Sequence, residues 1–245
     1  MSQTQRTESL FPSAMLHGAI VGTVLMVGLA SAGQAQRPGP PGPAFTRGTV
    51  PDTIAAVVIH PIVAAPFTCS EHPFYASYPV VLGDAAAADC IVVRYDLEGI
   101  PRRPPRYFEN EGRKNEDWFG WREPLLAPFD GTIDEVRAHP VANEPGTPGS
   151  PPAGFIVFLR SDGTRVVYGH VQEVMVKQGD TVKAGQPVAT VGNNGIGYMP
   201  HTHVGAWKGR VPLQIRIDLK VLSQLETARM NERSEEQTSE LQSPI

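Results

Sequence analysis

The chain has no excess of positive charge. Its 21 lysines and arginines are outnumbered by 25 aspartates and glutamates, which leaves a formal net charge of −4. Proteins that bind nucleic acids through the phosphates carry a strongly basic face. The composition therefore argues against a nucleic-acid partner.

Long apolar runs are also scarce. The run from Ala19 to Leu29 is about eleven to fourteen residues long, which is short for a membrane span. It follows a polar start and precedes "ASAGQAQ", whose small residues suit cleavage after Ala32 or Ala35. We interpret residues 1–35 as a signal peptide, so that no stable span remains after cleavage; an uncleaved anchor is the alternative. Both interpretations place the rest of the chain outside the cytoplasm, in the periplasm or secreted.

Only two cysteines are present, Cys69 and Cys90. Neither belongs to a C-x-x-C pair, so the sequence offers no dithiol redox motif and no cysteine-based zinc site. An even pair in an exported chain favours a disulfide, here closing a loop of about twenty residues. Two buried free thiols are the alternative.

Proline and glycine are abundant, with 24 of each, which favours short strands and turns over long helices. Residues 36–48 contain "RPGPPGPAFTRG" and are interpreted as a proline-rich linker. Residues 49–106 are interpreted as a small N-terminal extension, stapled by the disulfide and packed on the main domain. Its histidines, His60 and His72, have no partners at ligand spacing, so we assign them structural roles.

From Trp118 onward the sequence alternates short β-type runs with turns. The stretches are "PLLAPFDGTIDEVRA", "GFIVFLRSDGTRVVYGH" and "VMVKQGDTVKAGQPVATVG", with turns at Asp130-Gly131 and Ser161-Asp162-Gly163. About seven strands at this spacing predict an all-β domain over residues 107–220, a compact barrel or sandwich.

Histidines mark one region of this domain. In "GYMPHTHVGAW", His201 and His203 are two residues apart and would share one face of a strand, roughly 7 Å apart. In "TRVVYGH", the alternation of Val166, Tyr168 and His170 places a third imidazole at a strand end. An isolated H-x-H pair is more often explained by packing or surface exposure, but three histidines together predict a shared site.

Four ordered stretches resemble one family. "LLAPFDGTI", "DGTRVVYGH", "VKQGDTVKAGQPVATVGNNG" and "PHTH" are similar, in order and spacing, to the lysostaphin-type (LytM-like) zinc metallopeptidases, murein endopeptidases that cut peptide cross-links in bacterial cell walls. The resemblance covers roughly residues 117–206. It implies a β-sheet core of the duplicated hybrid motif kind, with the active site in a groove across one sheet.

The resemblance also implies roles for single residues. His203 matches a zinc ligand of the family, and His170 and His201 match the two histidines that flank the water bound to the metal. Asp117 lies about where the family's aspartate ligand belongs. A solvated loop carboxylate is the alternative interpretation of Asp117.

The sequence departs from the family at the first ligand. The family begins its site with H-x-x-x-D, but Arg113 stands four residues before Asp117, and no histidine occurs between His72 and His139. A catalytic zinc generally has three protein ligands and an open position. Arginine cannot coordinate a metal, and in the place of the missing ligand it would pair with Asp117. Substitute oxygen ligands remain candidates: Glu109, Glu111, Glu116 and Asn115.

Two functions follow from this pattern. The first is an exported zinc metalloendopeptidase that hydrolyses peptide cross-links of peptidoglycan. The second is a non-catalytic relative that binds the cell wall or regulates a partner hydrolase, which the missing ligand favours. The sequence does not predict an oligomeric state.

Other motifs are weaker. "GDTVKAGQPVATVG" resembles lipoyl and biotinyl carrier turns, but Lys183 does not occupy a hairpin tip. "VGNNGIG" is not followed by the Gly-Lys-Ser/Thr of a phosphate loop, so we interpret it as a loop that leads to the H-x-H strand. His139 precedes proline in a long loop and is interpreted as a surface residue.

The last residues need a separate interpretation. Beyond a C-terminal segment at 221–232, residues 233–245 read "RSEEQTSELQSPI", which differs only at Gln237 from the translation of a common sequencing-adapter oligonucleotide. We expect an assembly artefact or a polar, disordered tail here.

Overall fold

The computed structural model describes residues 46–73, 80–95 and 104–242, with the backbone alone for 233–242. The expected signal peptide and most of the proline-rich linker lie outside these residues. No helix within the described residues is both long and apolar enough to cross a membrane.

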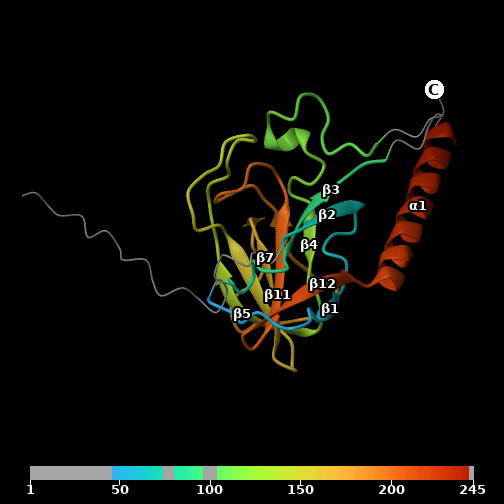
Figure 1. Cartoon of the computed structure of the whole chain (residues 1–245). Helices are drawn as coiled ribbons and strands as arrows, with labels where there is room; N and C mark the ends of the chain where they lie inside the picture. Colours follow the sequence, from blue (N-terminus) through green and yellow to red (C-terminus); the bar gives the residue numbers. More distant parts are fainter. Residues whose placement is uncertain (1–45, 74–79, 96–103, 243–245) are drawn as a thin grey trace, which may run out of the picture. The chain divides into compact units, whose positions relative to one another are not determined.

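Strands predominate among the regular elements of the described residues, which confirms the expected all-β fold (Figure 1). A 3-10 turn, η1 (Asn115–Asp117), and a long helix, α1 (Leu219–Gln242), are the helical elements of the described residues. The strands are β1 (Ala56–Ile59), β2 (Phe67–Glu71), β3 (Ala88–Val92), β4 (Pro124–Leu126), β5 (Gly131–Arg137), β6 (Phe155–Leu159), β7 (Thr164–Gly169), β8 (Val171–Gln172), β9 (Thr181–Val182), β10 (Pro187–Val191), β11 (Thr202–Lys208) and β12 (Val211–Ile217).

The strands form two sheets. The larger has nine strands in the order β1-β12-β11-β7-β6-β5-β9, with β3 added to β11 and β2 added to β3. The smaller contains β4, β10 and β8. All pairs are antiparallel except β1 and β12, which run parallel. The strand β11, which carries the H-x-H pair, therefore lies inside the large sheet with neighbours on both sides.

Apolar side chains cover both faces of the central strands. On β6, Ile156 and Phe158 belong to the main core, whereas Phe155 and Val157 belong to a second cluster with Trp207. This is the alternation expected of a strand whose successive side chains point to opposite faces. Burial on both faces makes the strands around β11 a rigid support for the side chains at their ends.

The N-terminal extension contributes strands to the large sheet. β1 pairs with β12, β3 pairs with β11, and β2 forms the outer strand beside β3. Cys69 of β2 and Cys90 of β3 lie directly opposite each other and form a disulfide, which confirms the expected pairing. As a result, the segment that carries His72 is brought beside the H-x-H strand.

The chain ends in α1. Asp218 precedes the helix, and its Oδ1 atom accepts hydrogen bonds from the backbone N–H groups of Lys220 and Val221, as in an N-cap. The helix continues to Gln242. The backbone of most of the segment interpreted as an artefact or disordered tail is therefore helical, and residues 243–245 lie outside the described part.

Candidate metal centre and active site

The structure brings the three predicted imidazoles together. His203 lies in β11, His201 directly precedes this strand, and His170 follows β7, the neighbouring strand. The ring centroids of His170 and His201 are 4.4 Å apart, and those of His170 and His203 are 6.4 Å apart.

The position of His170 depends on an unusual backbone. His170 has a φ of 60°, in the left-handed region that non-glycine residues seldom adopt. Its Nδ1 atom donates to the carbonyl oxygen of Asn194, 2.7 Å away, and the Asn194 side chain in turn holds Gly154 and Val171. The loop "VGNNGIG" therefore orients a histidine of the site. Strained residues held in this way are typical of functional sites.

The carboxylate that meets these rings comes from β3. Asp89 lies opposite His203 in the register between β3 and β11. Its Oδ1 atom is 3.0 Å from Nδ1 of His203 and 3.8 Å from Nε2 of His201. The side chain of Asp89 is 35% exposed, so the site is open to solvent on this side.

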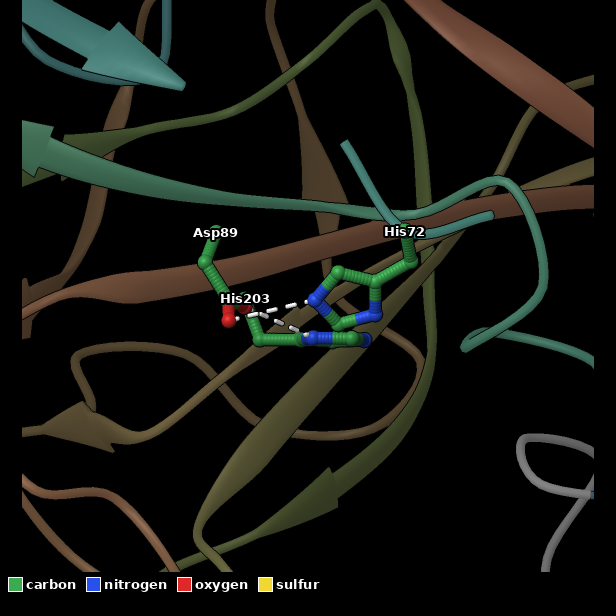
Figure 2. A group of neighbouring side chains, drawn as sticks. All are labelled: His72, Asp89 and His203. Carbon is green, nitrogen blue, oxygen red and sulfur yellow. Dashed lines mark hydrogen bonds and ion pairs between the residues drawn. The ribbon is translucent and has the colours of Figure 1, made fainter. Parts of the chain in front are cut away.

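A fourth histidine completes the cluster. Ser70 lies opposite Asp89, and His72, two residues further along the same segment, points to the same side. The Nε2 atom of His72 is 3.1 Å from Oδ2 of Asp89, so that Asp89 bridges His72 and His203 (Figure 2). His72, which was expected to have no partners at ligand spacing, therefore belongs to this cluster.

His72, Asp89 and His203 have the chemistry of a metal site. Among the described residues they form the one group of three candidate ligands whose donor atoms all lie within 4.8 Å of one another. Two imidazole nitrogens and a carboxylate oxygen are ordinary zinc ligands, and tetrahedral ligands at about 2.0–2.1 Å from zinc lie about 3.3 Å apart. The separations of 3.0 and 3.1 Å around Asp89 are close to that value. The three side chains therefore have the donor types and the proximity of a candidate site for a divalent metal.

Outer hydrogen bonds select the nitrogen that each histidine would offer. Nε2 of His203 lies 2.6 Å from the carbonyl oxygen of Gly83, which can only accept, so Nε2 donates and Nδ1 faces the cluster. Nδ1 of His72 lies 3.2 Å from Oδ1 of Asp84, which leaves Nε2 facing Asp89. Such outer partners orient the ligands of metal sites.

The charges of the cluster are strongly coupled. Burial would raise the pKa of Asp89, but the hydrogen bond from His203 and the charges of His201 and His203 lower it well below its ordinary range. For His203, burial lowers the pKa, yet the bonds to Asp89 and to the Gly83 carbonyl outweigh this effect and raise it. With protons on both nitrogens, His203 would lose the Nδ1 proton to solvent when a metal ion binds there.

His170 and His201 are neutral bases in the same site. Burial, followed by the charge of His201, lowers the pKa of His170 to about 4, and burial also lowers the pKa of His201. Nδ1 of His201 donates to the carbonyl oxygen of Met199, as Nδ1 of His170 does to Asn194. Each ring therefore has an unprotonated Nε2, which can accept a proton.

Asp117 lies outside this cluster. It ends η1, where its carboxylate accepts hydrogen bonds from Asn110 and from the backbone N–H of Lys114. Arg113 is 81% exposed and pairs with Glu111, not with Asp117 as expected. The geometry thus gives no support to Asp117 as a ligand, and Asp89 supplies the carboxylate instead. The candidate substitutes Glu109, Glu111, Glu116 and Asn115 also lie outside the group.

A signal for His72 and Asp89 was present in the sequence. Asp89 directly precedes Cys90, and His72 follows Cys69 by three residues. A disulfide between those cysteines places their neighbours side by side. The pairing of Cys69 with Cys90, rather than the spacing along the chain, therefore indicates the two candidate ligands.

Comparison with known sequences agrees with the geometry. The profile of "Peptidase family M23" matches residues 120–215, which include His170, His201 and His203. This segment is therefore similar to peptidase family M23. An "Uncharacterized metalloprotease" of Haemophilus influenzae is 40% identical over 81 residues, 33% of this chain and 15% of that protein. The chain thus spans a small part of the length of this relative. The metallopeptidase resemblance found in the sequence is confirmed, and His72 and Asp89 precede the matched segment.

Solved structures with a related arrangement include two peptidases. The catalytic domain of the antimicrobial peptidase lysostaphin from Staphylococcus simulans is 25% identical, with a TM-score of 0.31, over 56% of this chain and 78% of that chain. A zinc-containing peptidase from Vibrio cholerae is 20% identical, with a TM-score of 0.33, over 69% of this chain and 38% of that chain.

Proposed function

We propose that this chain is an exported, zinc-dependent endopeptidase that hydrolyses peptide cross-links of bacterial peptidoglycan in the cell envelope. The observation that carries the proposal is the cluster of His72, Asp89 and His203 beside the paired bases His170 and His201. The resemblance to murein endopeptidases supports the choice of substrate. The partial exposure of Asp89 and His72, 35% and 28% of their side chains, leaves room for a polymer to approach.

The roles follow from the contacts. His72 would bind zinc through Nε2, His203 through Nδ1, and Asp89 through its carboxylate, with Gly83 and Asp84 holding the two rings. Zinc would supply Lewis-acid polarisation of the scissile carbonyl and would acidify a water molecule. These three side chains would form a ligand set without Asp117, which supports the enzyme over the non-catalytic relative.

His170 and His201 would act in proton transfer. Each has a neutral ring with a free Nε2 atom and an Nδ1–H group fixed on a backbone carbonyl. Such a ring accepts a proton from the attacking water and then donates a hydrogen bond to the charge that develops on the substrate oxygen. A pKa of about 4 for His170 means that the ring is unprotonated throughout the neutral range.

Metal analysis of variants tests the ligand set. The purified chain should contain about one zinc ion per molecule, held by three protein ligands. We expect His72→Ala and Asp89→Ala to lose the metal after dialysis, because each removes a ligand, whereas Asp117→Ala should keep it. Zinc retained by Asp89→Ala and lost by Asp117→Ala would reverse the assignment.

Hydrolysis is measured separately, as new amino termini released from purified peptidoglycan. The wild-type chain and Asp117→Ala should release them, and His72→Ala, Asp89→Ala and His170→Ala should not. His170→Ala is informative because it should retain zinc while losing a proton acceptor. A zinc-loaded wild-type chain that releases no amino termini would contradict the enzyme proposal.

A further inference from the structure

The disulfide lies one rung from the metal-binding group. In the ladder between β2 and β3, Cys69 is opposite Cys90 and the next pair is Ser70 and Asp89. In the ladder between β3 and β11, Asp89 is opposite His203. The cross-link therefore joins the strand that leads to His72 to the strand that carries Asp89, next to the point where the two residues meet.

The sulfur atoms are on the other face of the sheet from the ligands. Neighbouring residues of a strand point to opposite faces, and Cys90 is buried in the main core while Asp89 faces the cluster. The disulfide is therefore no part of the coordination chemistry. It can act on the metal only by holding a strand in place.

β2 has little else to hold it. Among the described strands it pairs with β3 alone, and every residue from Thr68 to Glu71 is exposed. Phe67 packs partly on the core, and the remaining side-chain tie is an exposed hydrogen bond from Gln214 to Glu71. An edge strand with so little buried apolar surface opens easily. The covalent bond is its strongest tether.

We propose that the Cys69–Cys90 disulfide is a positioning element of the metal centre, which keeps β2 in register so that His72 meets Asp89. The proposal rests on the proposed function, since it concerns the same metal. Without the cross-link, His72 would be held by the bond from its backbone N–H to the carbonyl oxygen of Ala87, 2.7 Å long, and by the contacts of its ring with Asp84 and Asp89. The metal would then be held firmly by Asp89 and His203 and only intermittently by His72.

Zinc affinity, measured by competition with a chromogenic chelator, tests the proposal. In the Cys69→Ala/Cys90→Ala variant every ligand is kept, yet we expect the affinity to fall about tenfold or more, as for the loss of an outer partner of a metal site. A second variant, Cys69→Thr/Cys90→Val, uses residues that favour strands and should fold if the alanine variant does not. Both lack thiols that could bind zinc themselves.

A relocated cross-link provides the matched control. Glu71 and Ala88 are the next opposed pair of the same type along β2 and β3, because hydrogen-bonded and non-hydrogen-bonded pairs alternate. Adding Glu71→Cys and Ala88→Cys to the Cys69→Ala/Cys90→Ala background should restore zinc affinity to within a few fold of wild type. If the disulfide acted only on global stability, zinc affinity measured well below the melting temperature would not depend on the cross-link.

The outcomes are distinct. Weak binding without a cross-link and recovery with the relocated one support the proposal. Folded variants without a cross-link that bind zinc as tightly as the wild type would overturn it, while leaving the zinc site intact. A wild-type chain that binds no zinc would overturn both this inference and the proposed function.

Discussion

One carboxylate organises the site at the scale of single residues. Asp89 contacts His72 through Oδ2 and His203 through Oδ1, and both histidines are held from behind, by Asp84 and by the Gly83 carbonyl. Each ring is therefore fixed at two points before any metal binds. Ligands ordered in advance lose little conformational freedom on binding, which favours affinity.

A second carboxyl group, away from the site, makes stability depend on pH. Burial raises the pKa of Glu123 above its ordinary value of 4.5, against the opposing charges of Arg229 and Arg94. A raised pKa means that folding favours the protonated form, so this contribution is present at low pH and is lost as pH rises through the folded-state pKa. We expect Glu123→Gln to raise the free energy of unfolding at pH 7, with the advantage shrinking toward pH 4. Urea unfolding across this range measures it.

Glu144 offers a control for this substitution. It is exposed, and Glu144→Gln should leave the pH profile of stability unchanged. If Glu123→Gln lowered the free energy of unfolding at pH 7, the ionised side chain would be stabilising and burial would not be its dominant effect.

At the residue scale the sequence pointed to three of the five residues of the candidate site. His170, His201 and His203 were predicted because their strands and spacing are local features. His72 and Asp89 were not, because what brings them together is the pairing of β2, β3 and β11, which are far apart along the chain. Asp117 had the right spacing, but its carboxylate is satisfied by Asn110 and Lys114.

At the scale of elements, the close approach of a turn to β11 supports the metal centre. Gly205 follows His203 by two residues on the same face, and a Cβ atom at Gly205 would overlap the carbonyl oxygen of Gly83. The missing side chain therefore lets this carbonyl reach Nε2 of His203. The position of the turn at Gly83 and the orientation of His203 thus both depend on Gly205.

Gly205→Ala should move the turn away and break the bond to His203. We expect zinc affinity to fall by about tenfold to a hundredfold, the usual effect of removing an outer partner of a metal ligand. Gly163→Ala provides a comparison, because Gly163 has a φ of 85° and open space around it, so that it adds backbone strain in a hairpin without touching the site. Equal zinc affinity in both variants would show that the Gly83 carbonyl does not orient His203.

Element prediction succeeded where signals were local. The turn predicted at Ser161-Asp162-Gly163 does connect β6 to β7, which pair antiparallel. The runs on either side of Asp130-Gly131 are also strands, but β4 belongs to the small sheet and β5 to the large one. The parallel pairing of β1 with β12 had no local signal, because it depends on contacts between distant parts of the chain.

At the scale of the whole molecule, a segment outside the family match completes the site. The match begins at residue 120, yet β1, β2 and β3 precede it and belong to the same sheet as β11. The expected extension is therefore required for the metal centre and cannot be removed without losing His72 and Asp89. Its role was hidden because a family resemblance covers only what the family shares.

The predicted signal peptide can be tested on the intact protein. When the full chain is expressed in a bacterium and recovered from the envelope, mass spectrometry should find a mature N-terminus just after Ala32 or Ala35. The fraction should be soluble, because the apolar run is removed. An intact N-terminus in the membrane fraction would favour the uncleaved anchor.

The disulfide between Cys69 and Cys90 makes the order of the candidate metal site depend on the redox state of the compartment. Glutathione and thioredoxin keep such pairs reduced inside the cell, whereas the envelope oxidises them. In a newly made chain that has not yet crossed the inner membrane, β2 would therefore lack its cross-link and His72 would not be held in place to bind the metal. Under the proposed export and function, the metal site would be completed only after the chain has left the cytoplasm.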